Sequence, residues 1–170
     1  CPFSRHSMFA NSRAVTTNQE GVHPALEATV RRHLAHPWRA PLGDHDREAF
    51  ARAQAWVGTS RRPLILDSGC GTGRSSMLLA RRHPEALVLG LDQSAHRLAR
   101  AERRFDPPDN LLLVRTDCAG FWRLAEAAGW RPWQHYLLYP NPWPKSAHLK
   151  RRWHGHPVFP HLLALGGTLV

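Results

Sequence analysis

Short apolar runs alternate with longer amphipathic stretches from about residue 61 onwards. Four of these runs are expected to be strands, at residues 63–67, 86–92, 111–117 and 134–144. The stretches between them are expected to be helices, at residues 73–82, 94 to about 105, and 121–129. A last helix-like stretch at 148–165, interrupted near Pro157 and Pro160, leads into a fifth expected strand, GGTLV. Apolar strands that alternate with helices indicate a parallel sheet with helices on both faces.

This alternation predicts the fold class and the domain organisation. Because crossovers between parallel strands are right-handed, residues 61–170 are expected to form a doubly wound, Rossmann-like α/β sheet. Residues 22–60 precede it as a helical segment that packs on the core, and the polar residues 1–21 are expected to be a flexible arm. Ligands of such sheets bind beyond the carboxyl ends of the strands, so we expect the functional site there.

Two helices are expected within the segment that precedes the sheet. The first is predicted over residues 24–36, where apolar residues recur every four positions. The second begins at Asp44 or Asp46, since either acid can cap it, and it ends at Gly58.

The chain is strongly basic, with 23 Lys and Arg against 13 Asp and Glu and a formal net charge of +10. Such an excess favours a polyanionic partner, either a nucleic acid or an anionic membrane surface. A compositional bias toward Arg is the alternative explanation. No basic amphipathic helix with a clean apolar face is evident, so nucleic acid is favoured over a membrane surface. The apolar content of 42% argues against general disorder.

The cysteines indicate a reducing compartment and give no sign of a metal site. Cys1, Cys70 and Cys118 form no CxxC pair and no zinc-ligand spacing. A sparse, odd set of cysteines is typical of intracellular proteins, so we expect a cytoplasmic protein. No apolar run approaches the roughly 18 residues of a membrane span.

A glycine-rich loop follows the first expected strand, in the sequence DSGCGTG from Asp67 to Gly73. Gly69, Gly71 and Gly73 permit positive φ and close approach of the backbone to a ligand. The helix that begins after the loop offers free N–H groups to an anion. Asp92, at the end of the second strand, lies where an acid binds ribose hydroxyls.

Two cofactor classes suit this arrangement. The dinucleotide fingerprint G-x-G-x-x-G fails at its third glycine, since position 74 is Arg and position 76 is Ser. The loop instead resembles the D/E-x-G-x-G-x-G motif of class I S-adenosylmethionine-dependent methyltransferases. That resemblance places Asp67 near the methionine ammonium group, Asp92 at the ribose and Asp117 at the adenine, and makes their neighbours Gln93 and Cys118 further candidates for binding the cofactor. Alternatively, Asp117 caps the following helix.

A second motif narrows the resemblance. Residues 140–152, PNPWPKSAHLKRR, match all but one position of the signature P-D-P-W-x-K-x-x-H-x-K-R-R. The sequence is therefore similar to the bacterial tRNA (guanine-N7)-methyltransferase family over residues 60–170. The resemblance implies S-adenosylmethionine as cofactor and tRNA as substrate, with N7-methylguanosine as the product. The class I fold adds strands after the fifth, so the sheet is expected to be incomplete at the C-terminus.

The side chains of the second motif suit a nucleic acid. Trp143 can stack on a base, although a tryptophan is as readily part of the core. The motif also contains cationic side chains suited to phosphates, at Lys145, His148, Lys150, Arg151 and Arg152. A solvated helix face is the simpler interpretation of such a run.

The one mismatch is Asn141, where the family has an aspartate that orients the base or acts in catalysis. The resemblance makes Asn141 the candidate catalytic residue, with an uncharged amide that accepts and also donates. Two alternatives stay open. Asn-Pro-Trp-Pro also resembles the loop of amino-methyltransferases that act on exocyclic amines of RNA, DNA or protein glutamine. The second alternative is that the chain is an RNA-binding homologue with weakened catalysis. The sequence leaves monomer and homodimer equally open.

Overall fold

The computed structural model describes residues 21–104, 106–138, 140–141 and 143–170. Within them, five parallel strands form one sheet in the order β3-β2-β1-β4-β5. The strands are β1 (Leu64–Ser68), β2 (Leu87–Asp92), β3 (Leu111–Arg115), β4 (Gln134–Tyr136) and β5 (Thr168–Leu169). The predicted α/β parallel sheet is confirmed. The flexible arm expected at 1–21 lies, except for Gly21, outside the described residues.

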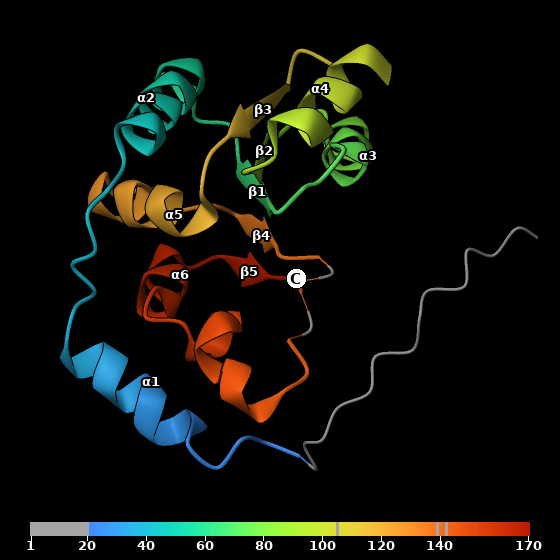
Figure 1. Ribbon diagram of the computed structural model, residues 1–170. Helices are drawn as coiled ribbons and strands as arrows, with labels where there is room; N and C mark the ends of the chain where they lie inside the picture. The colour runs from blue at the N-terminus through green and yellow to red at the C-terminus, as the bar shows by residue number, and fades with distance from the viewer. Residues whose placement is uncertain (1–20, 105, 139, 142) are drawn as a thin grey trace, which may run out of the picture.

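Helices cover both faces of the sheet (Figure 1). They are α1 (Leu26–Ala35), α2 (Asp44–Val57), α3 (Arg74–Arg82), α4 (Ala95–Arg104), α5 (Cys118–Ala127) and α6 (Phe159–Leu165). α3 and α4 lie on one face, and α2, α5 and α6 lie on the other. α1 lies apart from the sheet, below α6 (Figure 1). Every residue of β2 is buried, which explains its continuous apolar sequence.

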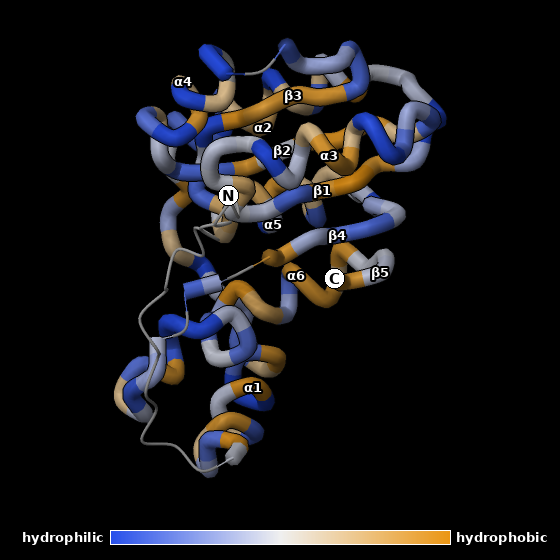
Figure 2. Tube along the Cα trace, turned by 90° about the vertical axis from the view of Figure 1, so that its right-hand side faces the viewer, coloured by the Kyte–Doolittle hydropathy of each residue, from blue (hydrophilic) through white to orange (hydrophobic). Residues whose placement is uncertain are grey.

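Each face of the sheet has its own apolar core. On the α2–α5 face, Phe121 and Trp122 are fully buried, and Phe50 of α2 packs edge-on against Phe121. On the α3 face, Met77 packs against Ile65 and Val88. β3, which lies between these cores, is one of the most apolar stretches of the chain and is drawn orange in Figure 2.

The fourth strand is shorter than the sequence predicts. β4 ends at Tyr136 instead of running to residue 144. The Leu137 amide still donates to the Val170 carbonyl, but Pro140 and Pro144 have no N–H group with which to continue a ladder. The chain therefore leaves the sheet as a loop at its carboxyl edge.

Two helix predictions also differ from the structure. α5 begins at Cys118 and not at residue 121, because the Asp117 side chain caps it. The stretch at 148–165 is not one interrupted helix. It contains two 3-10 helices, Ser146–Arg151 (η1) and Trp153–Gly155 (η2), followed by α6, which has Pro160 in its first turn.

A buried histidine lies in the middle of the sheet. His135 of β4 is 1% exposed, and its Nε2 lies 2.8 Å from the Ser68 hydroxyl oxygen. The Trp122 indole N–H donates to the same oxygen at 3.0 Å. Nδ1 of His135 has no hydrogen-bond partner among the described residues. Burial lowers the pKa of His135 to about 4, so the ring is neutral at pH 7.

The His135 pKa makes stability depend on pH. The unfolded chain protonates this ring near pH 6.5 and the folded chain only near pH 4, so unfolding takes up a proton in between. The free energy of unfolding should therefore fall by about 3 kcal/mol from this group as pH falls from 6.5 to 4. We expect His135→Gln to lose that part of the decrease, measured by urea unfolding at pH 7 and pH 4.5. An equal decrease in the two proteins would contradict this assignment.

Candidate functional site

The glycine loop between β1 and α3 turns back toward the end of β2. The amides of Gly69 and Cys70 both donate to the Leu91 carbonyl, at 2.7 and 3.0 Å. Gly69 and Gly71 have φ of 76° and 59°, and a Cβ at either position would meet no atom within 4 Å. The space above these two residues is therefore open, and glycine suits both the backbone conformation and a ligand that lies close to it.

Asp92 holds the tip of this loop from the end of β2. Its side chain is 3% exposed, and its two oxygens accept from the amides of Gly71 and Ser94, at 2.9 and 2.8 Å. Nε of Arg97 lies 3.5 Å from the carboxylate. A carboxylate has about four acceptor positions, so Asp92 keeps capacity for hydroxyl donors of a ligand.

Asp67 lies beneath the loop and lines neither of the two cavities described below. It is buried, and its Oδ2 accepts from the hydroxyls of Ser75 and Ser76, at 2.6 and 2.7 Å. Burial raises the pKa of this carboxyl, while the two serine hydroxyls lower it. These contacts tie the start of α3 to β1. The expected place of Asp67 beside an ammonium group stays a prediction.

Asp117 has the structural role that the sequence left as an alternative. Its Oδ2 accepts from the Gly120 amide at 3.1 Å and so caps α5, yet its exposed side chain also faces the cavities. Asp46 of α2 fixes the backbone here, because its Oδ1 accepts from the Thr116 hydroxyl and the Asp117 amide. Neither Asp44 nor Asp46 caps α2, whose N-cap is a glycine without a side-chain bond.

Cys118 is buried next to Asp117, and burial raises its pKa to about 12. The thiol is therefore neutral at pH 7 and acts as a small apolar group. Together with Gly69 and Asp92 it lines a cavity of about 170 Å³ at the carboxyl edge of the sheet.

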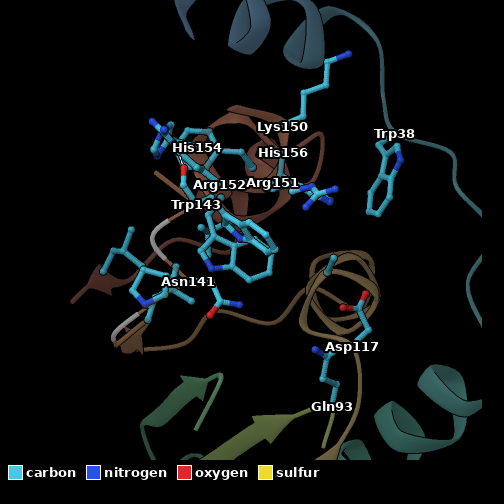
Figure 3. A pocket seen from close by; sticks show the side chains of 17 residues that line it. Trp38, Gln93, Asp117, Asn141, Trp143, Lys150, Arg151, Arg152, His154 and His156 are labelled. Carbon is cyan, nitrogen blue, oxygen red and sulfur yellow. Dashed lines mark hydrogen bonds between the residues drawn. The ribbon is translucent and has the colours of Figure 1, made fainter. Parts of the chain in front are cut away.

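A larger cavity of about 720 Å³ adjoins this one, between the Pro-Trp loop and the η1–η2 segment (Figure 3). Several residues line both cavities, namely Gln93, Asp117, Leu137, Pro140, Asn141 and Trp153. The predicted cofactor loop and the predicted substrate loop therefore open into one continuous site, with Asn141 at the boundary.

Trp143 has an unusual backbone conformation. Its φ of 40° is the only positive φ at a non-glycine position among the described residues. Such a conformation costs of order 1–3 kcal/mol and persists only where the surroundings enforce it. Arg152 supplies that constraint, since its Nε donates to the Trp143 carbonyl at 3.0 Å and its Nη2 to the Lys145 carbonyl at 3.3 Å. The Arg151 guanidinium lies 4.9 Å from the Trp143 ring.

The structure divides the predicted substrate residues into two groups. Trp143 and three cations line the larger cavity, namely Lys150, Arg151 and Arg152. Lys145 and His148 do not line it. The His148 ring instead packs edge-on against Trp143, with the ring centroids 5.4 Å apart. Pro142 lies outside the described residues.

The far wall of the larger cavity was missed by the sequence analysis. Trp38, in the linker between α1 and α2, faces the cavity from the side opposite Trp143 (Figure 3). Arg123 and His156 hold its ring, with the guanidinium 4.9 Å and the imidazole 5.0 Å from the ring centroid. The sequence HPWRAP combines prolines, a tryptophan and a cation, as the second motif does. This likeness is the sequence signal from which Trp38 could have been predicted.

Two histidines, His154 and His156, also line the larger cavity. Burial lowers the pKa of both His154 and His156, and the nearby Arg152 lowers that of His154 further. Both rings are therefore neutral at pH 7 and leave the cations of the cavity as its main charges.

No group of three or more His, Cys, Asp or Glu side chains that is suited to a metal ion occurs among the described residues. None of the helices in this part of the chain has the length and apolarity that crossing a membrane requires.

The sequence of this chain is similar to those of known methyltransferases. A family model described as "Putative methyltransferase" matches residues 61–165. A tRNA (guanine-N(7)-)-methyltransferase of Nocardia farcinica is 30% identical, over 88% of this chain and 52% of that protein. The enzyme of the same name from Mycolicibacterium gilvum is 32% identical, over 78% of this chain and 59% of that protein. This chain thus spans little more than half the length of these curated relatives.

The fold is also similar to that of a methyltransferase of known structure. The antibiotic-resistance methyltransferase Kmr aligns with a TM-score of 0.50 and 23% sequence identity, over 71% of this chain and 62% of that one. At this level of identity the likeness supports the fold alone.

Proposed function

Since the chain belongs to the methyltransferase family whose model its residues 61–165 match, we propose that it methylates N7 of a guanine in tRNA with S-adenosylmethionine. One observation carries this proposal. Gly69 of the glycine loop lines the smaller cavity and the strained Trp143 lines the larger one, and the two cavities adjoin at Asn141. The names of the curated relatives support the choice of tRNA and of guanine N7. A tRNA substrate would place the protein in the cytoplasm.

The residues of the smaller cavity fit S-adenosylmethionine. Asp92 retains acceptor capacity for the ribose hydroxyls, and Gly69 and Gly71 leave room for the methionine part. Gln93, Asp117 and the neutral Cys118 would then flank the nucleoside. When bound, this cofactor supplies an electrophilic methyl group on a sulfonium.

The protein's own contribution would be alignment. Guanine N7 has a lone pair and no proton, so the attack requires no general base, and none of the cavity residues has to remove a proton. Trp38 and Trp143, on opposite sides of the larger cavity, give it aromatic walls for a base. Lys150 and Arg151 are exposed at the cavity and can neutralise the flanking phosphates.

Asn141 would orient the base relative to the cofactor. It lines both cavities, and its amide can either accept from the guanine amino group or donate to O6. Arg152 would act indirectly, because it holds the Trp143 and Lys145 carbonyls and thereby the shape of the loop.

Analysis of the product tests the proposed function. Unmodified tRNA is incubated with the protein and S-adenosylmethionine carrying a labelled methyl group, then digested to nucleosides for mass spectrometry. We expect the label in N7-methylguanosine. Label in an exocyclic amine would establish the amino-methyltransferase alternative, and tRNA binding without any transfer would establish the RNA-binding alternative. Either result would refute the proposal.

A further inference from the structure

Positive charge is concentrated on one face of the sheet. The two helices that cover this face contain seven arginines, namely Arg74, Arg81, Arg82, Arg97, Arg100, Arg103 and Arg104. Glu102 is the one acidic residue in the sequences of these two helices. α2 and α5, on the opposite face, have mixed charges, with acids at Asp44, Asp46, Glu48 and Glu126 and arginines at Arg47, Arg52 and Arg123. The helices α3 and α4 are therefore strongly basic, whereas α2 and α5, on the opposite face of the sheet (Figure 1), have mixed charges.

The seven arginines present their charge to solvent. All are exposed. Among the described residues, Arg97 is the only one of the seven with a carboxylate within ion-pair distance, that of Asp92. Acids in the loops that follow the helices, Glu85, Asp106 and Asp109, form no ion pair with them in the described part of the chain. Arginines that have no ion pair among the described residues repel one another when they lie on adjacent helices. An anion bound over them would reduce this repulsion.

Three arginines of α4 form a row that extends from the site along the helix. Arg97, Arg100 and Arg104 follow one another at i, i+3 and i+7, so they form a stripe along one side of the helix. The stripe rises about 10 Å along the helix axis. It begins at the site, because Arg97 lines the smaller cavity. Arg115, at the exposed end of β3, lies close by and donates to the Gln93 carbonyl at 3.3 Å.

We propose that the arginine face, made of the seven arginines of α3 and α4, binds the phosphate backbone of the same tRNA whose guanine enters the larger cavity. The inference rests on the proposed function. A tRNA is far larger than the cavity, so its backbone must continue over neighbouring surfaces. Arginine binds phosphate in bidentate fashion and without desolvating a compact ammonium, which suits seven exposed guanidinium groups to this partner.

Removal of two of these charges tests the arginine face. Arg100→Ala with Arg104→Ala leaves both cavities intact, since neither residue lines them. We expect tRNA binding to weaken about tenfold at 0.1 M salt, and the slope of log Kd against log salt to decrease by about 1.5. The matched control is Arg47→Ala with Arg131→Ala, which removes the same charge from exposed positions elsewhere. The control should keep wild-type affinity and slope.

Further variants and ligands separate the possible outcomes. Arg100→Lys with Arg104→Lys retains the charge and should keep most of the slope. Equal affinity and slope in the alanine variant and the wild type would overturn the arginine face while leaving the proposed function intact. Wild-type protein that binds no tRNA at any salt would overturn the proposed function itself. Loss of binding to phosphatidylserine vesicles, with tRNA binding unchanged, would assign the face to a membrane and refute the inference.

Discussion

Replacing Asp92 with alanine is expected to raise the dissociation constant for S-adenosylmethionine at least about 100-fold. The carboxylate would lose two charged hydrogen bonds to ribose hydroxyls, each contributing about 1.5–3 kcal/mol. The variant also removes the acceptor for the Gly71 and Ser94 amides, so the loop loses its anchor to β2. Isothermal titration calorimetry with S-adenosylmethionine measures the effect.

A matched variant separates the loss of a contact with the cofactor from the loss of one negative charge. Asp109→Ala removes an equal charge from an exposed loop outside both cavities and should leave the dissociation constant within twofold. Circular dichroism reports whether the Asp92 variant is folded. A folded Asp92 variant that binds the cofactor as tightly as the wild type would refute the assignment of the smaller cavity.

The second large effect is expected at Asn141. Asn141→Ala should lower the turnover number for tRNA methylation about 100-fold, the loss typical of a single hydrogen-bonding group that positions the reacting centre. The dissociation constant for S-adenosylmethionine should stay within threefold, because Asp92 and the glycine loop are untouched. Single-turnover measurements with saturating tRNA isolate the chemical step.

The substitution that restores the family residue provides the comparison. Asn141→Asp keeps an acceptor for the guanine amino group, so we expect it to retain at least a third of the wild-type turnover. An alanine variant as fast as the wild type would show that Asn141 has no role in orientation. An alanine variant that instead binds the cofactor poorly would move Asn141 to the cofactor cavity.

The elements that the sequence predicted well are those whose sequence pattern depends on local structure or on complete burial. β2 is buried at every residue, and its apolar run predicted the start of the strand to within one residue. Gly58 ends α2 as predicted, and the Ser94 hydroxyl, at the predicted start of the next helix, accepts from the Arg97 amide. The end of β4 was misplaced because its apolar sequence continues into a loop whose shape depends on a side-chain contact from Arg152, which no apolar pattern reveals.

The same distinction applies to the site. Gly69, Gly71 and Asp92 could be predicted as candidates because the spacing of a loop and a strand end is local, and the structure brings Gly71 and Asp92 into contact. Asp46 and Trp38 were not predicted as candidates, because each reaches the site through a contact with a residue 70 or more positions away, Thr116 in one case and Arg123 in the other. No periodicity encodes such a contact. Asp67 shows the converse, since two serines of α3 occupy an oxygen that the motif assigned to the cofactor.

The identity of the ligand above the glycine loop is tested most directly by a crystal structure of the protein soaked with S-adenosylhomocysteine. The account predicts density above Gly69 and Gly71, with ribose hydroxyls within hydrogen-bonding distance of the Asp92 carboxylate and the sulfur directed toward Asn141. An unoccupied loop at millimolar ligand, or a ligand bound elsewhere on the molecule, would contradict it.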